Sequence, residues 1–189
     1  MLAPSPDHHP VAALPFWRAN PAAVAALIVA FVGAATIAGA WFFELVVELK
    51  PCPLCLEQRV PYYIGIPLGL IVAFAAWRKA PRAIVISGLL ALAALMLWGA
   101  YLGVFHAGIE WGWWVGPQEC SGAPQLGPPG DFMKRLQEIN ITRCDQAAWR
   151  FQGISLAGYN ALIALALAAV ALVGAVAAAK NYGSSSVSQ

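Results

Sequence analysis

Residues 22–43 read AAVAALIVAFVGAATIAGAWFF and contain no charged side chain. A helix needs roughly 20 consecutive apolar residues to cross the hydrocarbon core of a bilayer, so this stretch predicts a membrane-spanning helix. Pro21 and Asn20 precede it, a first-turn proline and a candidate N-cap. The stretch is too long for the apolar region of a cleavable signal peptide, so we expect it to be retained as a span.

Three further apolar stretches are long enough to span, at residues 60–77, 83–105 and 154–179. Pro61 suits the first turn of the second stretch, whereas Pro67 is expected to kink it. The chain is 60% hydrophobic and 11% charged, whereas soluble domains carry about 25% charged residues. Alanine and glycine are plentiful in all four stretches, which favours close helix packing in lipid. We therefore predict an all-α integral membrane four-helix bundle, with residues 1–189 forming a single membrane domain.

The charges predict an orientation. The connector 78–82 holds three cations in five residues, and Arg18 and Lys180 lie on the same side of the four spans. By the positive-inside rule this connector and both termini are cytoplasmic. The exported segments are then 44–59 and 106–153. A net charge of +2 gives no reason to expect a nucleic-acid partner.

The longer exported segment contains a candidate amphipathic helix. Asp131 can cap a helix over residues 131–139, in which Phe132, Met133, Leu136 and Ile139 share one face. Such a helix either lies flat on the membrane surface or packs on the end of the bundle.

All four cysteines fall in the exported segments: Cys52, Cys55, Cys120 and Cys144. Two residues separate Cys52 from Cys55, a spacing common to redox-active dithiols. With Cys52 as N-cap and Pro53 at the first helical position, the helix N–H groups would favour a thiolate at Cys52. Arg59 follows Cys55 by four residues, so on a continuous helix the two share a face. There the cation would stabilise a Cys55 thiolate or an oxygen of a reduced quinone.

Other readings of the cysteines remain open. Four cysteines can form a zinc site, but no second two-residue spacing occurs, and we predict no metal site. A purely structural Cys52–Cys55 disulfide would close too small a loop to stabilise much. Cys120 and Cys144 enclose 23 residues, and a disulfide there would contribute roughly 3 kcal/mol in the entropic description. The tandem His8–His9 suits a solvated tail better than a metal.

A redox-active pair needs an electron acceptor, because thiol–disulfide exchange only moves the oxidation from one pair to another. The sequence contains no haem-attachment, flavin or dinucleotide motif. By elimination, a lipid-soluble quinone is the expected acceptor, docked where Cys55 and Arg59 meet the headgroup region.

The stretch Pro51-Cys52-Pro53-Leu54-Cys55-Leu56-Glu57-Gln58-Arg59, which follows the first span and opens the second, resembles the DsbB family of disulfide-forming membrane proteins. The likeness covers nearly the whole chain: four spans, a CxxC in the first exported loop, and a spaced cysteine pair in the second. Trp149 and Phe151 before the last span are also similar. The resemblance implies a protein of the bacterial inner membrane with a periplasmic loop.

The resemblance also implies a role for each residue. Cys120 would form the mixed disulfide with a periplasmic thioredoxin-fold oxidase of the DsbA type, and its partner Cys144 would exchange with Cys52. Cys55 would carry the thiolate and face the quinone, ubiquinone or menaquinone, with Arg59 assisting at the quinone oxygen. This placement of the thiolate differs from the helix-end argument for Cys52, and we prefer it. His106 is similar to a residue that lies near the quinone in the family, although a histidine at a helix end with no functional role explains it equally well.

Two rival classes share some features. A vitamin K epoxide reductase-like protein also combines a bundle, a quinone and cysteine pairs, but its CxxC belongs near the last spans. Four-span structural proteins such as tetraspanins or claudins carry exported disulfides, but they need adjacent cysteines followed by glycine, which this chain lacks.

Overall fold

The computed structural model describes residues 20–117 and 143–184. Its elements are the long helices α2 (Pro21–Leu45), α4 (Val60–Trp77), α5 (Arg82–Glu110) and α7 (Leu156–Ser184), the short helix α3 (Pro53–Glu57), and the strands β1 (Arg150–Phe151) and β2 (Ile154–Ser155). Four helical stretches, one of them α3 and α4 together, are long and apolar enough to cross a membrane. The predicted all-α four-helix membrane fold is confirmed. The helix expected at 131–139 lies outside the described residues.

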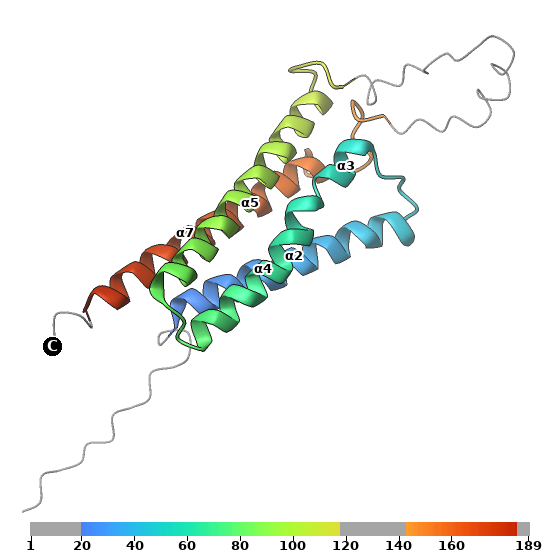
Figure 1. Ribbon diagram of the computed structural model, residues 1–189. Helices are drawn as coiled ribbons and strands as arrows, with labels where there is room; N and C mark the ends of the chain where they lie inside the picture. Colours follow the sequence, from blue (N-terminus) through green and yellow to red (C-terminus); the bar gives the residue numbers. More distant parts are fainter. Residues whose placement is uncertain (1–19, 118–142, 185–189) are drawn as a thin grey trace, which may run out of the picture.

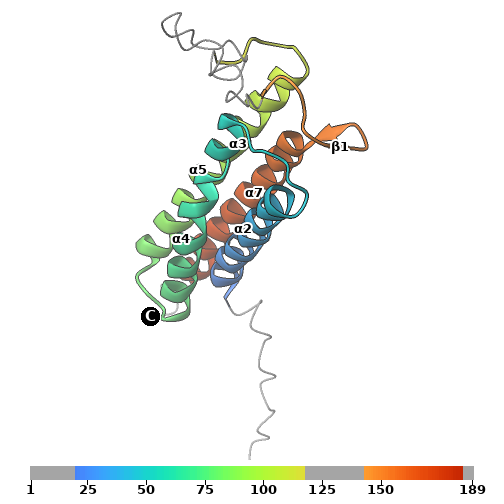
Figure 2. The same cartoon turned by 90° about the vertical axis from the view of Figure 1, so that its right-hand side faces the viewer.

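The four long helices form a ring (Figures 1 and 2). In this ring α2 packs against α4 and α7, and α5 packs against the same two helices. The α4–α5 turn lies at the same end of the bundle as the start of α2 and the end of α7 (Figure 1). The short helix α3 and the β1–β2 hairpin lie at the opposite end, which we call the α3 end.

At the α3 end, the end of α5 and the start of α7 differ from the bounds of the predicted apolar stretches. The helix α5 continues to Glu110, so residues 106–110, which the hydropathy pattern assigned to a loop, form its last turn. Ile154 and Ser155 pair with Arg150 and Phe151 in an antiparallel hairpin, so α7 begins only at Leu156. Gln152 and Gly153 form its two-residue turn with φ of 48° and 83°, a left-handed backbone that two-residue hairpins favour.

The predicted starts of α2 and α4 are confirmed. The Asn20 side chain accepts a hydrogen bond from the N–H of Ala23 at 3.1 Å, and its own amide donates to the carbonyl of Ala76 at 2.9 Å. The cap therefore also ties the start of α2 to the end of α4. Pro61 lies in the first turn of α4, which continues as one helix across Pro67.

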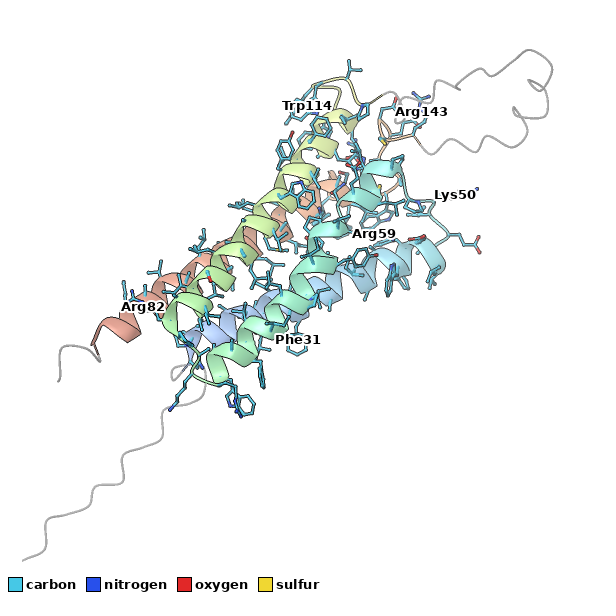
Figure 3. All side chains as sticks on the ribbon, viewed as in Figure 1. Phe31, Lys50, Arg59, Arg82, Trp114 and Arg143 are labelled. Carbon is cyan, nitrogen blue, oxygen red and sulfur yellow. The ribbon has the colours of Figure 1, made fainter. Side chains whose placement is uncertain are left out.

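Small side chains fill the inside of the bundle and large ones cover the outside. The buried residues of α7 are largely alanines that recur every three or four positions: Ala157, Ala161, Ala164, Ala168, Ala171, Ala175 and Ala178. Phe31, Ile71 and Val173 are all more than half exposed on the outer surface (Figure 3 labels Phe31). This distribution suits a protein surrounded by lipid, where close backbone approach, rather than burial of large side chains, holds helices together.

We predict that Gly103→Ala destabilises the bundle. A Cβ at Gly103 would lie 2.8 Å from the backbone nitrogen of Ala161, so α5 and α7 would have to separate, at a cost of about 1–3 kcal/mol. Gly39→Ala is the matched control, because a Cβ there meets nothing within 4 Å, and helix propensity alone favours it by up to about 1 kcal/mol. Unfolding in detergent micelles measures both. Equal stability of the two variants would contradict the close α5–α7 contact.

Candidate functional site

The two cysteines of the CxxC motif meet at the start of α3. Cys52 is the N-cap and Pro53 opens the helix, as the sequence predicts, and the Cys52 sulfur accepts a hydrogen bond from the N–H of Cys55 at 3.2 Å. The two sulfurs are 2.6 Å apart and both cysteines are free. The short helix thus holds the pair where a disulfide forms or opens with little backbone movement.

The two thiols have different surroundings. Cys52 is only 2% exposed, whereas Cys55 is partly exposed. The hydrogen bond between the two sulfurs and the burial together raise the pKa of the Cys52 thiol, and they outweigh the contribution of the helix N–H groups. The expectation that Cys52 is the more acidic thiol is therefore wrong, because the sequence did not show how deeply α3 buries it.

His106 lies beside the cysteine pair rather than at a solvated helix end. It is 3% exposed, and its Nε2 is 3.7 Å from the Cys52 sulfur. On its other side, Nδ1 accepts a hydrogen bond from the Gln58 amide at 2.7 Å. Glu110, one turn further along α5, has a carboxylate oxygen 3.8 Å from Nε2.

A chain of hydrogen bonds crosses the bundle behind His106. The Tyr62 hydroxyl donates to the Asn160 carbonyl oxygen at 2.8 Å, and the Asn160 amide donates to the Gln58 carbonyl oxygen at 2.8 Å. Gln58 then donates to Nδ1 of His106. With the amides oriented in this way, the ring hydrogen of a neutral His106 lies on Nε2, the nitrogen that faces Cys52.

These hydrogen bonds between Tyr62, Asn160, Gln58 and His106 were not predicted from the sequence. Tyr62 and Asn160 are polar residues within apolar stretches, which is a recognised signal of a functional site in membrane helices. Gln58 gave no such signal, because its position in a turn before α4 looks like an exposed loop. Gln58 is nonetheless only 6% exposed, and it contacts His106 of α5 and Asn160 of α7.

Arg59 does not lie on the same continuous helix as Cys55, which differs from the prediction. A turn at Gln58 and Arg59 separates α3 from α4, so Arg59 and Cys55 do not share one continuous helix. Arg59 is instead the N-cap of α4 and forms an ion pair with Glu44 of α2 at 2.6 Å. The Arg59 side chain is 12% exposed and that of Glu44 31%. Glu44 was not singled out from the sequence.

One cavity of about 530 Å³ lies beside the cysteine pair, the hydrogen-bonded residues behind His106 and the Arg59–Glu44 ion pair. The predicted site residues that line it are Cys52, Cys55, Arg59 and His106. Apolar side chains of α2 and α7 form its other walls, among them Val32, Ile37, Phe43, Leu156 and Ile163. Figure 3 shows Lys50 and Arg143 toward the α3 end and Arg59 further down the bundle. The volume is typical of pockets for small organic ligands.

Cys144 lies next to the first cysteine pair. It is fully buried, it is disulfide-bonded, and it belongs to one buried cluster with Cys52, Leu54 and Ile109. Its backbone also hydrogen-bonds His106. Cys120 lies outside the described residues, so its pairing stays a prediction. The structure thus brings five of the six predicted site residues together.

The comparison with known proteins agrees with this geometry. The family described as disulfide bond formation protein DsbB matches residues 22–174. The chain belongs to the DsbB family. Disulfide bond formation protein B of Polaromonas sp. is 27% identical over 171 residues, which cover 85% of this chain and 94% of the relative. The protein of the same name from Nitrosospira multiformis is 30% identical over 155 residues, covering 77% and 87%. No solved structure matches the chain.

Membership in the DsbB family makes the chain a membrane-embedded thiol–disulfide oxidoreductase. The site contains a free dithiol, a disulfide-bonded cysteine beside it, and a histidine within reach of both. It also brings three potential metal donors together, since the ligand atoms of Cys52, Cys55 and His106 lie within 4.8 Å of one another. The spacing of the cysteines in the sequence predicts no metal site.

We predict that alkylation of the reduced protein modifies Cys55 before Cys52. Burial limits access to Cys52, and its raised pKa leaves less thiolate at neutral pH. Brief iodoacetamide treatment followed by peptide mass spectrometry measures the order, and denatured protein, in which both thiols are exposed, is the control. Modification of Cys52 first in the folded protein would show that the assignment of the two thiols is reversed.

Proposed function

We propose that this DsbB-family protein reoxidises a periplasmic thioredoxin-fold oxidase of the DsbA type and passes the electrons to a membrane quinone. One observation carries the proposal. The Cys52–Cys55 pair shares a buried cluster with Cys144 and also lines a largely apolar cavity of about 530 Å³. A thiol oxidase needs such an arrangement, with one disulfide partner and one electron acceptor in reach of the same dithiol.

The first half of the reaction is an exchange between cysteine pairs. A thiolate of the partner attacks the Cys120–Cys144 disulfide at Cys120, forms a mixed disulfide and releases Cys144 as a thiol. Cys144 is packed against Cys52 in one buried cluster, which supports direct exchange between these two residues. The Cys144 thiolate attacks the Cys52–Cys55 disulfide at Cys52 and releases Cys55. The second thiol of the partner breaks the mixed disulfide and releases Cys120, which attacks Cys144, restores the Cys120–Cys144 disulfide and releases Cys52. The outcome is an oxidised partner and a reduced Cys52–Cys55 pair, with two electrons and two protons transferred.

The second half needs an acceptor of two electrons and two protons, and a quinone bound in the cavity supplies that capacity. The volume suits a quinone head group, since small-molecule sites measure roughly 300–1,000 Å³. The walls from α2 and α7 are mostly apolar, and charged side chains, among them Arg59 and Glu44, also line the cavity.

The residues around the pair have distinct tasks in this scheme. Arg59 supplies N–H donors to an oxygen that gains negative charge, and its ion pair with Glu44 fixes the guanidinium against α2. Cys55, the more exposed thiol, faces the cavity. His106 Nε2 lies 3.7 Å from the Cys52 sulfur and donates its hydrogen toward that sulfur, which steadies negative charge on it during exchange.

The orientation of the bundle follows from the same proposal. The cysteines lie at the α3 end, which faces the periplasm, and the basic α4–α5 turn and both termini face the cytoplasm. The protein is then a multi-pass protein of the bacterial inner membrane.

We predict that purified protein mixed with a reduced DsbA-type oxidase consumes one quinone for each pair of thiols lost, followed by quinone absorbance. Cys52→Ser and Cys55→Ser reduce the rate to the uncatalysed background, because each removes one sulfur of the only dithiol in contact with the cavity among the described residues. Wild-type turnover by both serine variants would exclude the proposed function.

We also predict that Arg59→Ala raises the KM for quinone by about 10-fold or more. A charge-assisted hydrogen bond contributes roughly 1.5–3 kcal/mol, and 1.4 kcal/mol corresponds to tenfold in affinity. Arg78→Ala, at the other end of α4, is the matched control and leaves the KM unchanged. The exchange of Cys120–Cys144 with the partner stays intact in both.

Arg59→Ala also leaves Glu44 without its ion-pair partner, so the double variant Arg59→Ala with Glu44→Gln is needed. If Arg59 contacts the quinone, the double variant keeps the raised KM. Recovery of the wild-type KM in the double variant would show that Arg59 only neutralises Glu44.

A further inference from the structure

The deepest part of the site holds four groups that bind soft divalent metals. The sulfurs of Cys52 and Cys55 and the Nε2 of His106 lie within 4.8 Å of one another. Glu110 follows His106 by four residues on α5, so the two side chains project on the same side of the helix. Its Oε1 is 3.8 Å from the same Nε2. Two sulfurs, one imidazole and one carboxylate are a tetrahedral donor set that Zn²⁺ accepts.

Glu110 has no evident role in the redox reaction, and its environment calls for a cation. Its side chain is 5% exposed, and among the described residues its Oε2 is buried with no hydrogen-bond partner. Ser155 hydrogen-bonds the carboxylate and Arg150 interacts with it electrostatically, but the hydrogen bond of the Arg150 guanidinium goes to the Glu110 backbone carbonyl. A buried carboxylate oxygen without a partner is costly, and a metal ion next to it removes that cost.

We propose that the reduced Cys52–Cys55 pair, together with His106 and Glu110, binds Zn²⁺ or a similar soft divalent metal ion, and that this binding competes with oxidation of the pair. Two thiols lose their protons and form two metal–sulfur bonds, with no change of oxidation state. The Cys52–Cys55 disulfide has no thiolates to offer, so the site exists in the reduced protein alone.

The geometry requires three adjustments. The Glu110 carboxylate lies near Nε2 of His106 but outside the group of ligand atoms within 4.8 Å of one another, so its side chain moves toward the sulfurs. Tetrahedral zinc–sulfur bonds of about 2.3 Å hold two sulfurs farther apart than the 2.6 Å seen here, and rotation of the partly exposed Cys55 side chain supplies the difference. A metal on Nε2 moves the ring hydrogen of His106 to Nδ1, where Gln58 must then accept it. Gln58, Asn160 and Tyr62 can each donate or accept, so these three contacts reverse direction together when the two amides turn over, and the Gln58 amide then gives up its bond to the Leu54 carbonyl.

The regulatory consequence rests on the proposed function. A metal held by the dithiol keeps it reduced and unable to pass electrons to a quinone, so turnover stops while the metal stays bound. Metal binding itself does not depend on the quinone, so the metal site and the proposed function are tested by separate experiments.

Co²⁺ is the probe, because its absorption spectrum reports thiolate ligands and tetrahedral geometry. The full chain is prepared without a histidine tag, with His8→Ala and His9→Ala, and with Cys120→Ser and Cys144→Ser so that Cys52 and Cys55 are the only thiols. We expect one Co²⁺ per reduced chain with a thiolate charge-transfer band, displaced by Zn²⁺. After oxidation of the pair we expect no such band.

Substitutions separate the proposed site from adventitious binding. Glu110→Gln weakens Co²⁺ binding by about 10-fold or more, and His106→Ala removes the tetrahedral spectrum. Glu57→Gln is the matched control, an exposed carboxylate on α3 close in sequence to the pair, and it leaves the affinity unchanged. Equal effects of Glu110→Gln and Glu57→Gln, or equal binding by the oxidised protein, would overturn the proposal.

A redox titration is an independent test, and it can also be done on the protein that retains all four cysteines. Because the metal binds only the reduced pair, the midpoint potential of Cys52–Cys55 rises by about 30 mV for each tenfold increase in Zn²⁺ above its dissociation constant. An unchanged potential contradicts the proposal. A Zn²⁺-dependent potential in a protein that never reduces quinone would retain the metal site and refute the proposed function instead.

Discussion

The side-chain amide of Gln58 is the contact on which the site depends. It donates to the Leu54 carbonyl at 3.3 Å and to His106 of α5 at 2.7 Å, and it accepts from Asn160 of α7 at 2.8 Å. One buried side chain thereby joins the turn between α3 and α4 to two other helices. In an interior of low polarity such bonds are strong and an unmade one is expensive. The position of α3, and of the dithiol that it carries, follows from these three contacts.

The bundle combines close helix packing with an open cavity at the α3 end. Alanine and glycine bring α5 and α7 together, whereas at the α3 end side chains of α2, α4, α5 and α7 border a cavity. The ion pair between Arg59 and Glu44 links α2 to α4 along one border of that space. A cavity with apolar walls and a charged border results, beside a pair of free cysteines.

Most of the fold could be predicted from the sequence, because lipid imposes a simple rule of length and hydropathy. The caps at Asn20 and Cys52 were also predictable, since they depend on neighbours in the chain. The site was predictable only where a motif marks it. The contact of Glu44 with Arg59 and those of Gln58 with His106 and Asn160 join residues far apart in sequence, and no local pattern distinguishes Glu44 and Gln58 from solvated loop residues. The helix-end argument for an acidic Cys52 fails for the same reason, because burial of Cys52 is a tertiary property.

The central claim is that a quinone occupies the cavity beside Cys55, and photoaffinity labelling tests it most directly. Protein in lipid bilayers is irradiated with an azido-quinone, and the labelled peptides are identified by mass spectrometry. The account predicts labels on the cavity walls, in residues 32–44 of α2 and 156–163 of α7, that an excess of unmodified quinone prevents. Labels that resist competition and fall on the outer surface around Phe31 and Ile71 would contradict it.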